Sequence, residues 1–117
     1  MLEFVKSKAI ELAEAIMELD EYKEFIKNEE LLKADEVAQQ MIAEFQRKQQ
    51  DFVAKQLSGE FDQDLLNELT TLQSKLNARE SVVRFIESYN RLLTVLGEIM
   101  DLISERIRLD LSEVYRK

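Results

Sequence analysis

The chain almost completely lacks the residues that interrupt helices. In 117 residues there is no proline, and there are only two glycines, Gly59 and Gly97. Proline and glycine are the residues that most strongly disfavour a helix interior. Their scarcity, together with apolar residues that recur at steps of three and four, predicts an all-α fold. We expect a single domain over residues 1–117, built as an antiparallel helical bundle of long helices with a long C-terminal helix.

The apolar spacing and the helix-end signals together predict where the helices lie. Asp20, Asp35 and Asp62 each precede an amphipathic stretch and suit the N-cap position. Phe61 is expected to pack on Leu66 as a hydrophobic staple. Five helices are therefore expected, at about residues 2–18, 20–32, 35–57, 62–77 and 81–108.

Gly59 follows Ser58 at the end of the third predicted helix, and another helical pattern starts about three residues later. Glycine readily adopts the left-handed conformation that closes a helix. Helix connections of this length usually join antiparallel neighbours. We therefore interpret Gly59 as a helix-hairpin turn rather than as part of a phosphate-binding loop.

The last predicted helix carries the most regular apolar pattern. Its seam has steps of four and three throughout, which is typical of coiled-coil packing. Further apolar residues flank the seam, so the apolar arc is wider than one partner helix needs. We expect a homodimer or a higher oligomer that uses this helix; the alternative is that the helix forms the buried centre of a monomeric bundle. The predicted interface residues are Val82, Ile86, Tyr89, Leu93, Leu96, Met100, Ile103 and Ile107.

Gly97 lies inside this last helix, where glycine costs about 1 kcal/mol relative to alanine. A close approach of another helix at Gly97 would offset that cost.

Charge is distributed unevenly along the chain. Residues 1–78 contain 9 Lys and Arg against 17 Asp and Glu, whereas residues 79–117 contain 7 of each. The net charge of −8 disfavours general nucleic-acid binding, because an acidic surface repels phosphates. Six of the seven arginines lie at or after Arg79. Arg79, Arg84 and Arg91 are a candidate patch for a partner, and the alternative is ordinary ion pairing along a helix surface.

The residue types that most often carry catalysis are missing. The chain has no histidine and no cysteine, which removes thiolate ligands, cysteine nucleophiles and the usual general base. Glu11, Glu14 and Glu18 form a row on the first helix, but they lie off its apolar seam and are interpreted as a solvated face. We expect no enzyme activity, no catalytic residues, no metal, no cofactor, no membrane span and no targeting segment.

Residues 34–103 resemble the YlbF/YmcA family of small helical proteins from Gram-positive bacteria, and within it the YheA-like branch. Upstream, "LDEYKEF" is similar to the entry to the family's second helix. The features that carry the resemblance are the pair Asp35-Glu36, Met41, Phe45, Gln56 before "SGE", and the segments "LGEIMDLI" and "LSEVY".

The resemblance implies an all-helical, oligomeric and cytoplasmic protein. Relatives in this family are non-enzymatic regulators of competence, sporulation and biofilm formation, and work in a complex that influences RNA processing. Some of them hold iron–sulfur clusters on cysteines, and this cofactor is not carried over because the chain has no cysteine.

Our first hypothesis is therefore a homo-oligomeric regulatory adaptor that acts through protein surfaces. Two alternatives stay open: an RNA-associated module that uses the C-terminal arginines, and a small-ligand binder or enzyme, which would require an apolar pocket with convergent polar groups.

Overall fold

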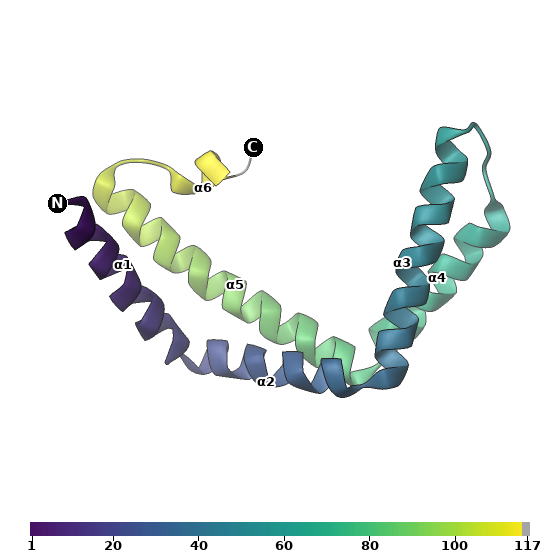
Figure 1. Ribbon diagram of the computed structural model, residues 1–117, viewed down its shortest axis with the longest axis horizontal. Helices are drawn as coiled ribbons and strands as arrows, with labels where there is room; N and C mark the ends of the chain where they lie inside the picture. Colours follow the sequence, from purple (N-terminus) through teal and green to yellow (C-terminus); the bar gives the residue numbers. More distant parts are fainter. Residues whose placement is uncertain (116–117) are drawn as a thin grey trace. The chain divides into compact units, whose positions relative to one another are not determined.

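The computed structural model describes residues 1–115 and is built from helices, with no strand in that range (Figure 1). The all-α prediction and the long C-terminal helix are confirmed. The helices are α1 (Leu2–Met17), α2 (Asp20–Ala34), α3 (Glu36–Leu57), α4 (Gln63–Ala78), α5 (Glu80–Ile107) and α6 (Leu111–Tyr115).

The bounds of α1 to α5 differ from the expected ranges by two residues at most, and α6 was not expected. Asp35 and Asp62 are confirmed as N-caps, because their carboxylates accept hydrogen bonds from the amides of Ala38 and Leu65. Asp20 was assigned wrongly as a cap: it is the first residue of α2 itself.

The chain forms two compact units. One unit is Asn28–Ile86, and the other combines Met1–Lys27 with the chain from Glu87 onward. A single domain over residues 1–117 remains a prediction.

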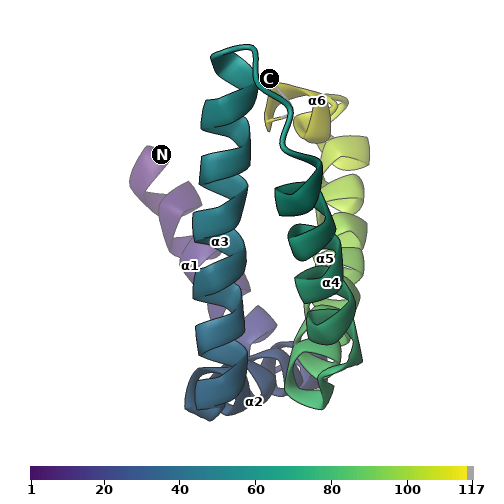
Figure 2. The same ribbon diagram turned by 90° about the vertical axis from the view of Figure 1, so that its right-hand side faces the viewer.

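The unit Asn28–Ile86 contains the antiparallel hairpin of α3 and α4, which lie side by side (Figures 1 and 2). Its core includes a cluster of Ala38, Leu76 and Val82, with Leu32, Met41, Ile42 and Phe45 packed against it. Burying one such aliphatic side chain contributes about 1.5–3 kcal/mol. The α4 side of the hairpin buries leucines at steps of four, three and four: Leu65, Leu69, Leu72 and Leu76.

The turn of the hairpin is closed by backbone hydrogen bonds. Gly59 has a φ of +84°, in the left-handed region where a side chain is strained. The amide of Gly59 donates to the carbonyl of Gln56 at 3.0 Å, and that of Glu60 donates to Lys55 at 2.8 Å. This pair of bonds is the Schellman arrangement, which satisfies the last carbonyls of α3 and reverses the chain into α4.

In the other unit, described up to residue 115, few side chains are removed from solvent. Leu92 and Ser88 are buried there, and the rings of Phe25 and Tyr89 lie 5.7 Å apart. α1 has no buried residue, and the view in Figure 2 shows it separated from α5.

α5 ends in the same kind of turn as α3 but without a glycine. Arg108 has a φ of +59°, and the amide of Leu109 donates to the carbonyl of Ser104 at 3.1 Å. The Ser104 hydroxyl then accepts from the amide of Leu111 at 3.1 Å, which fixes the start of α6.

None of the helices within residues 1–115 combines the length and the apolar character needed to cross a bilayer.

Candidate interaction surfaces

The predicted interface residues divide according to their environment along α5. Val82 is buried with Ala38 and Leu76, so it contributes to the core of its own unit. Leu96, Met100 and Ile103 are half-buried. The remaining four are between 43% and 50% exposed: Ile86, Tyr89, Leu93 and Ile107. We call the seven residues of this seam from Ile86 to Ile107 the α5 face.

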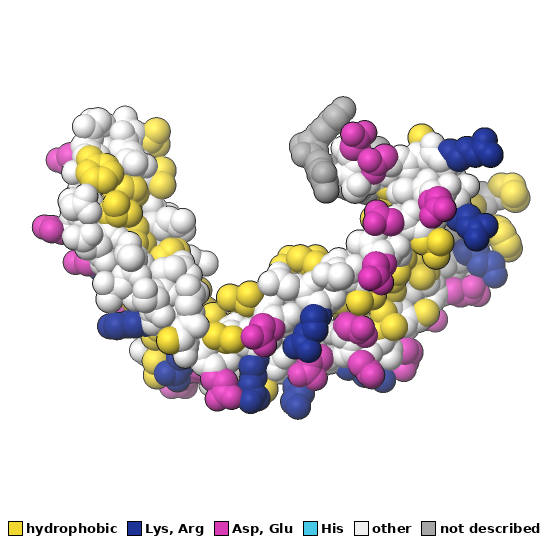
Figure 3. Space-filling model, turned by 180° about the vertical axis from the view of Figure 1, so that it is seen from behind, with side chains coloured by type: hydrophobic (Ala, Val, Ile, Leu, Met, Phe, Trp, Pro, Cys, Tyr) yellow, Lys and Arg dark blue, Asp and Glu magenta, His cyan; other side chains and the backbone are white. Residues whose placement is uncertain are grey.

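A second apolar surface lies on α1. The exposed large apolar side chains of this helix include Leu2, Phe4, Val5, Ile10 and Leu12. On the face shown in Figure 3, hydrophobic side chains reach the surface at the N-terminal end of the chain. Like the α5 face, α1 therefore presents apolar area that the described chain does not cover.

Gly97 does not mark a close approach of helices within the described chain. A Cβ atom added at Gly97 would meet no atom within 4 Å. No close helix crossing within the described chain therefore compensates for the cost of glycine at this helical position.

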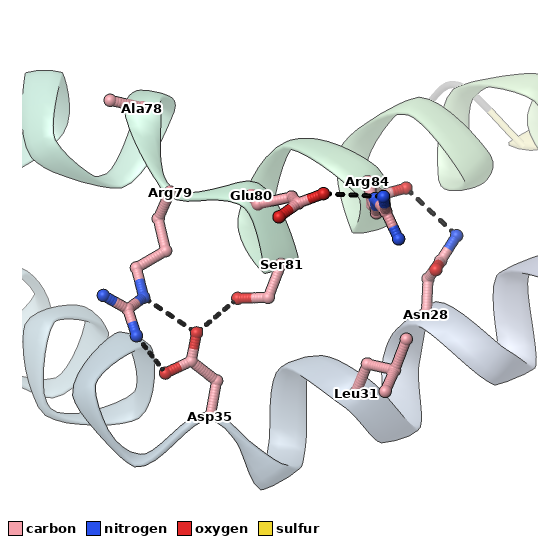
Figure 4. Close-up of a pocket in the computed structure, with 8 residues that line it drawn as sticks. All are labelled: Asn28, Leu31, Asp35, Ala78, Arg79, Glu80, Ser81 and Arg84. Atoms are coloured by element: carbon pink, nitrogen blue, oxygen red, sulfur yellow. Dashed lines mark hydrogen bonds and ion pairs between the residues drawn. The ribbon is translucent and has the colours of Figure 1, made fainter.

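Arg79, the first residue of the predicted arginine patch, is part of an intrachain cluster (Figure 4). Its Nε and Nη2 donate to the two carboxylate oxygens of Asp35, each at 2.8 Å. The Ser81 hydroxyl donates to Asp35 Oδ2 at 2.6 Å. Because Asp35 also caps α3, one carboxylate fastens the start of α3 to the break between α4 and α5. We call Asp35, Arg79 and Ser81 the Asp35 clasp.

Electrostatics in the clasp favour the ionised carboxylate. The hydrogen bonds from Arg79, followed by the one from Ser81, hold the pKa of Asp35 well below its usual range. The same pairing raises the pKa of Arg79 above its ordinary value. A bidentate pair between guanidinium and carboxylate is both strong and directional, so Arg79 is committed to this contact.

Arg84 lies one helical turn after Glu80, whose carboxylate it meets at 2.6 Å. The backbone carbonyl of Arg84 accepts a hydrogen bond from the buried side chain of Asn28 at 3.3 Å. Together with the clasp, these residues line an open depression of about 490 Å³ (Figure 4). Leu31 and Ala78 add apolar surface to the lining, and its charged side chains are paired with one another.

Arg91 belongs to the other unit, where its Nε lies 3.5 Å from the carbonyl of Glu87. It lines a depression with Asp20, Glu21, Glu24 and Ser88. The structure thus brings together Arg79 and Arg84 of the predicted patch. Arg116, another of the C-terminal arginines, lies outside the described residues.

Glu11, Glu14 and Glu18 are exposed on α1. Lys8 and Lys23 pair with Glu11 and Glu18 at 3.3 Å and 3.4 Å. Within residues 1–115, no group of three or more acidic residues is placed to hold a metal ion.

Sequence reasoning identified Asp35 only as a cap and missed its contact with Arg79. Capping is a local signal that can be recognised within a few residues, whereas the partners in the clasp are separated by 44 positions. No short motif encodes a pairing over that distance.

Comparison with known proteins assigns the chain to a family. The family described as "Control of competence regulator ComK, YlbF/YmcA" matches residues 5–108. The chain belongs to the YlbF/YmcA family. It is 35% identical over 100 residues to a UPF0342 protein of Desulfitobacterium hafniense, covering 85% of this chain and 81% of that protein. A UPF0342 protein of Symbiobacterium thermophilum is 33% identical, with 86% and 90% of the two chains covered.

The fold is also that of a solved structure. A chain in the crystal structure of Bacillus subtilis RicA in complex with RicF matches with a TM-score of 0.76 at 23% identity, covering 96% of both chains. This likeness supports the helical fold of the YlbF/YmcA chain described here. Membership of the YheA-like branch remains a prediction.

Proposed function

We propose that this YlbF/YmcA protein is a non-enzymatic regulatory adaptor that forms a homo-oligomer, most simply a dimer, and binds protein partners through its helical surfaces. The observation that carries the proposal is the α5 face, where an uninterrupted apolar seam continues beyond its buried start at Val82 with four residues exposed and three half-buried. Sustained seams of this spacing are used for helix–helix packing. The cytoplasmic location implied by the resemblance and the absence of a cofactor remain predictions.

The titratable groups support a structural role rather than a catalytic one. Among the described residues, shifted pKa values occur at Asp35, Lys48, Lys55, Asp62 and Arg79. Each of these groups is held in an intrachain ion pair or a helix cap. Ion-pair networks shift pKa values without any catalysis, so these shifts need no reaction to explain them.

The family context supports binding of proteins. The similar solved chain comes from a complex of two proteins, RicA and RicF. The RNA-associated alternative has less support, because Arg79 and Arg84 are engaged by Asp35 and Glu80. Strong phosphate binding would have to compete with these pairs.

An affinity purification from a lysate of the native host, read by quantitative mass spectrometry, tests the adaptor proposal. The tagged wild-type chain is compared with Leu96→Glu, which places a charge in the α5 face, and both are repeated with ribonuclease. A stoichiometric protein partner that survives ribonuclease is expected for the wild type. Recovery of the chain alone, or of partners that are lost with ribonuclease, would contradict the proposal.

A further inference from the structure

The turn end of the hairpin, residues 51–64, exposes large apolar side chains far from the α5 face along the sequence. We call these residues the hairpin tip. Leu57 is 85% exposed, Phe61 is 60% exposed and Val53 is 47% exposed. Val53 and Leu57 are four positions apart on α3 and therefore share one face of it. Figure 3 shows hydrophobic side chains at the surface of this end of the hairpin, with acidic side chains beside them.

The hairpin tip is held in one conformation by several contacts. Lys55 Nζ lies 2.6 Å from Asp62 Oδ2, and this ion pair links the end of α3 to the start of α4. The other oxygen of the same carboxylate, Asp62 Oδ1, caps α4 by accepting a hydrogen bond from the amide of Leu65. The rings of Phe52 and Phe61 meet edge to face, with their centroids 5.7 Å apart. Together with the backbone bonds at Gly59, these contacts fix where the exposed apolar groups stand. A preorganised surface loses less entropy when it binds a partner.

The charge of the hairpin tip is strongly acidic. Residues 51–64 contain four acidic residues, namely Asp51, Glu60, Asp62 and Asp64, against one cation, Lys55, which gives a net charge of −3. Lys55 is already paired with Asp62, and within residues 1–115 no salt bridge engages Asp51, Glu60 or Asp64. Asp51, Lys55, Asp62, Asp64 and Glu68 help to line an open depression of about 400 Å³.

We propose that the hairpin tip is a docking site for a cationic amphipathic segment of a partner protein. An apolar side chain of the partner's segment would cover Leu57 and Phe61. A neighbouring Lys or Arg of the same segment would reach the acidic depression. A second copy of this chain is a poor occupant, because both the tip and the whole chain are acidic. An anionic lipid surface is repelled for the same reason. The proposal rests on the proposed adaptor function and names the chemistry of one partner.

The test uses the full ¹⁵N-labelled chain and three helical peptides with the same leucine face and a polar face of Lys, Gln or Glu. The lysine peptide is expected to shift amide signals within residues 51–64 and to bind at least about tenfold more tightly than the glutamine peptide at low salt. Leu57→Ser combined with Phe61→Ser is expected to weaken that binding by about tenfold or more. Leu102→Ser, at a residue 56% exposed on α5, is the matched control and should leave binding unchanged.

A charge-reversed variant gives an independent test if loss of the apolar groups disturbs the turn. Asp51→Lys with Glu60→Lys should transfer the preference of the tip from the lysine peptide to the glutamate peptide. Equal binding of all three peptides, shifts that map outside residues 51–64, or tip shifts that depend on protein concentration alone would overturn the proposal. Self-association is tested separately from docking. Of these variants, only Leu96→Glu is expected to change the mass of the particle, and the tip variants are expected to leave it unchanged.

Discussion

α1 and α4 are both 16 residues long and both carry apolar residues at steps of three and four, yet they have opposite environments. α4 buries four leucines against α3, whereas α1 buries none. The same contrast holds within α5, where Val82 is buried and the following residues of the seam are not. Periodicity therefore predicts a helix and its apolar face, but it does not tell whether the partner lies in the same chain.

The largest effects are expected when a leucine from the buried side of α4 is compared with a leucine from the α5 face. Leu72→Ala removes a side chain that is 8% exposed, and should lower the free energy of unfolding by about 2–5 kcal/mol at any protein concentration. Leu93→Ala, at a residue 45% exposed, should cost much less in dilute solution and more as concentration rises. Chemical denaturation at two protein concentrations measures both. A concentration-independent cost at Leu93 would show that the α5 face packs within its own chain.

The next largest effect is expected at the Asp35 clasp, which joins residues 44 and 46 positions apart within Asn28–Ile86. Asp35→Asn keeps a capping side chain but loses the charge that Arg79 meets, so the melting temperature at pH 7 should fall. Because the pKa of Asp35 is lowered in the folded chain, its stabilisation is present above the unfolded value of about 4 and is lost as pH falls below it. The difference between wild type and variant should therefore narrow with acidification below about pH 4.

Thermal melts from neutral to acidic pH measure this effect, and a double variant serves as its control. Asp35→Asn combined with Arg79→Gln should be no less stable than the worse single variant, because both changes remove the same pair. Fully additive losses, or a difference that widens toward low pH, would contradict the assignment.

The two glycines are expected to respond in opposite ways, with a moderate loss at Gly59. Gly59→Ala forces a side chain into a left-handed conformation and should cost about 1–2 kcal/mol, although a Cβ there meets no atom within 4 Å. Urea denaturation of the purified variant measures the loss. No change in stability would mean that the turn adopts another conformation.

The smallest effect is expected at Gly97. Gly97→Ala should stabilise α5 by up to about 1 kcal/mol, because the position is helical and open within the described chain. Equilibrium unfolding combined with the particle mass checks the result. A loss of stability accompanied by a smaller mass would place a close helix crossing from a second copy at Gly97.

The sequence predicted those parts of the fold that depend on local chemistry. Asp35, Asp62 and Gly59 lie at helix ends, and each signal is contained within a few residues, so the bounds of α1 to α5 were predicted within two residues. The five-residue α6 was missed, because it is too short to show a period. The packing of Phe61 on Leu66 stays a prediction. The contact of the Phe61 ring with Phe52 across the hairpin was missed, because it depends on how α3 and α4 are placed.

The candidate surfaces were predictable only in part, for the same reason. The α5 face can be predicted from the spacing of its apolar residues. Four of its seven residues are exposed, which is expected of an interface when the chain is isolated. The arginine patch was defined by composition, which could not show that Arg79 is held by a carboxylate 44 positions away. Long-range pairing is decided by the packed structure, and a single sequence does not display it.

The central claim is that the α5 face is covered by a second copy of the chain. Sedimentation equilibrium over a roughly hundredfold range of concentration tests it most directly, with Leu96→Glu measured in parallel. The wild type is expected to show a particle at least twice the chain mass of 13.8 kDa, and the variant a smaller or aggregated particle. A wild-type mass of 13.8 kDa throughout the range, unchanged in the variant, would contradict the account.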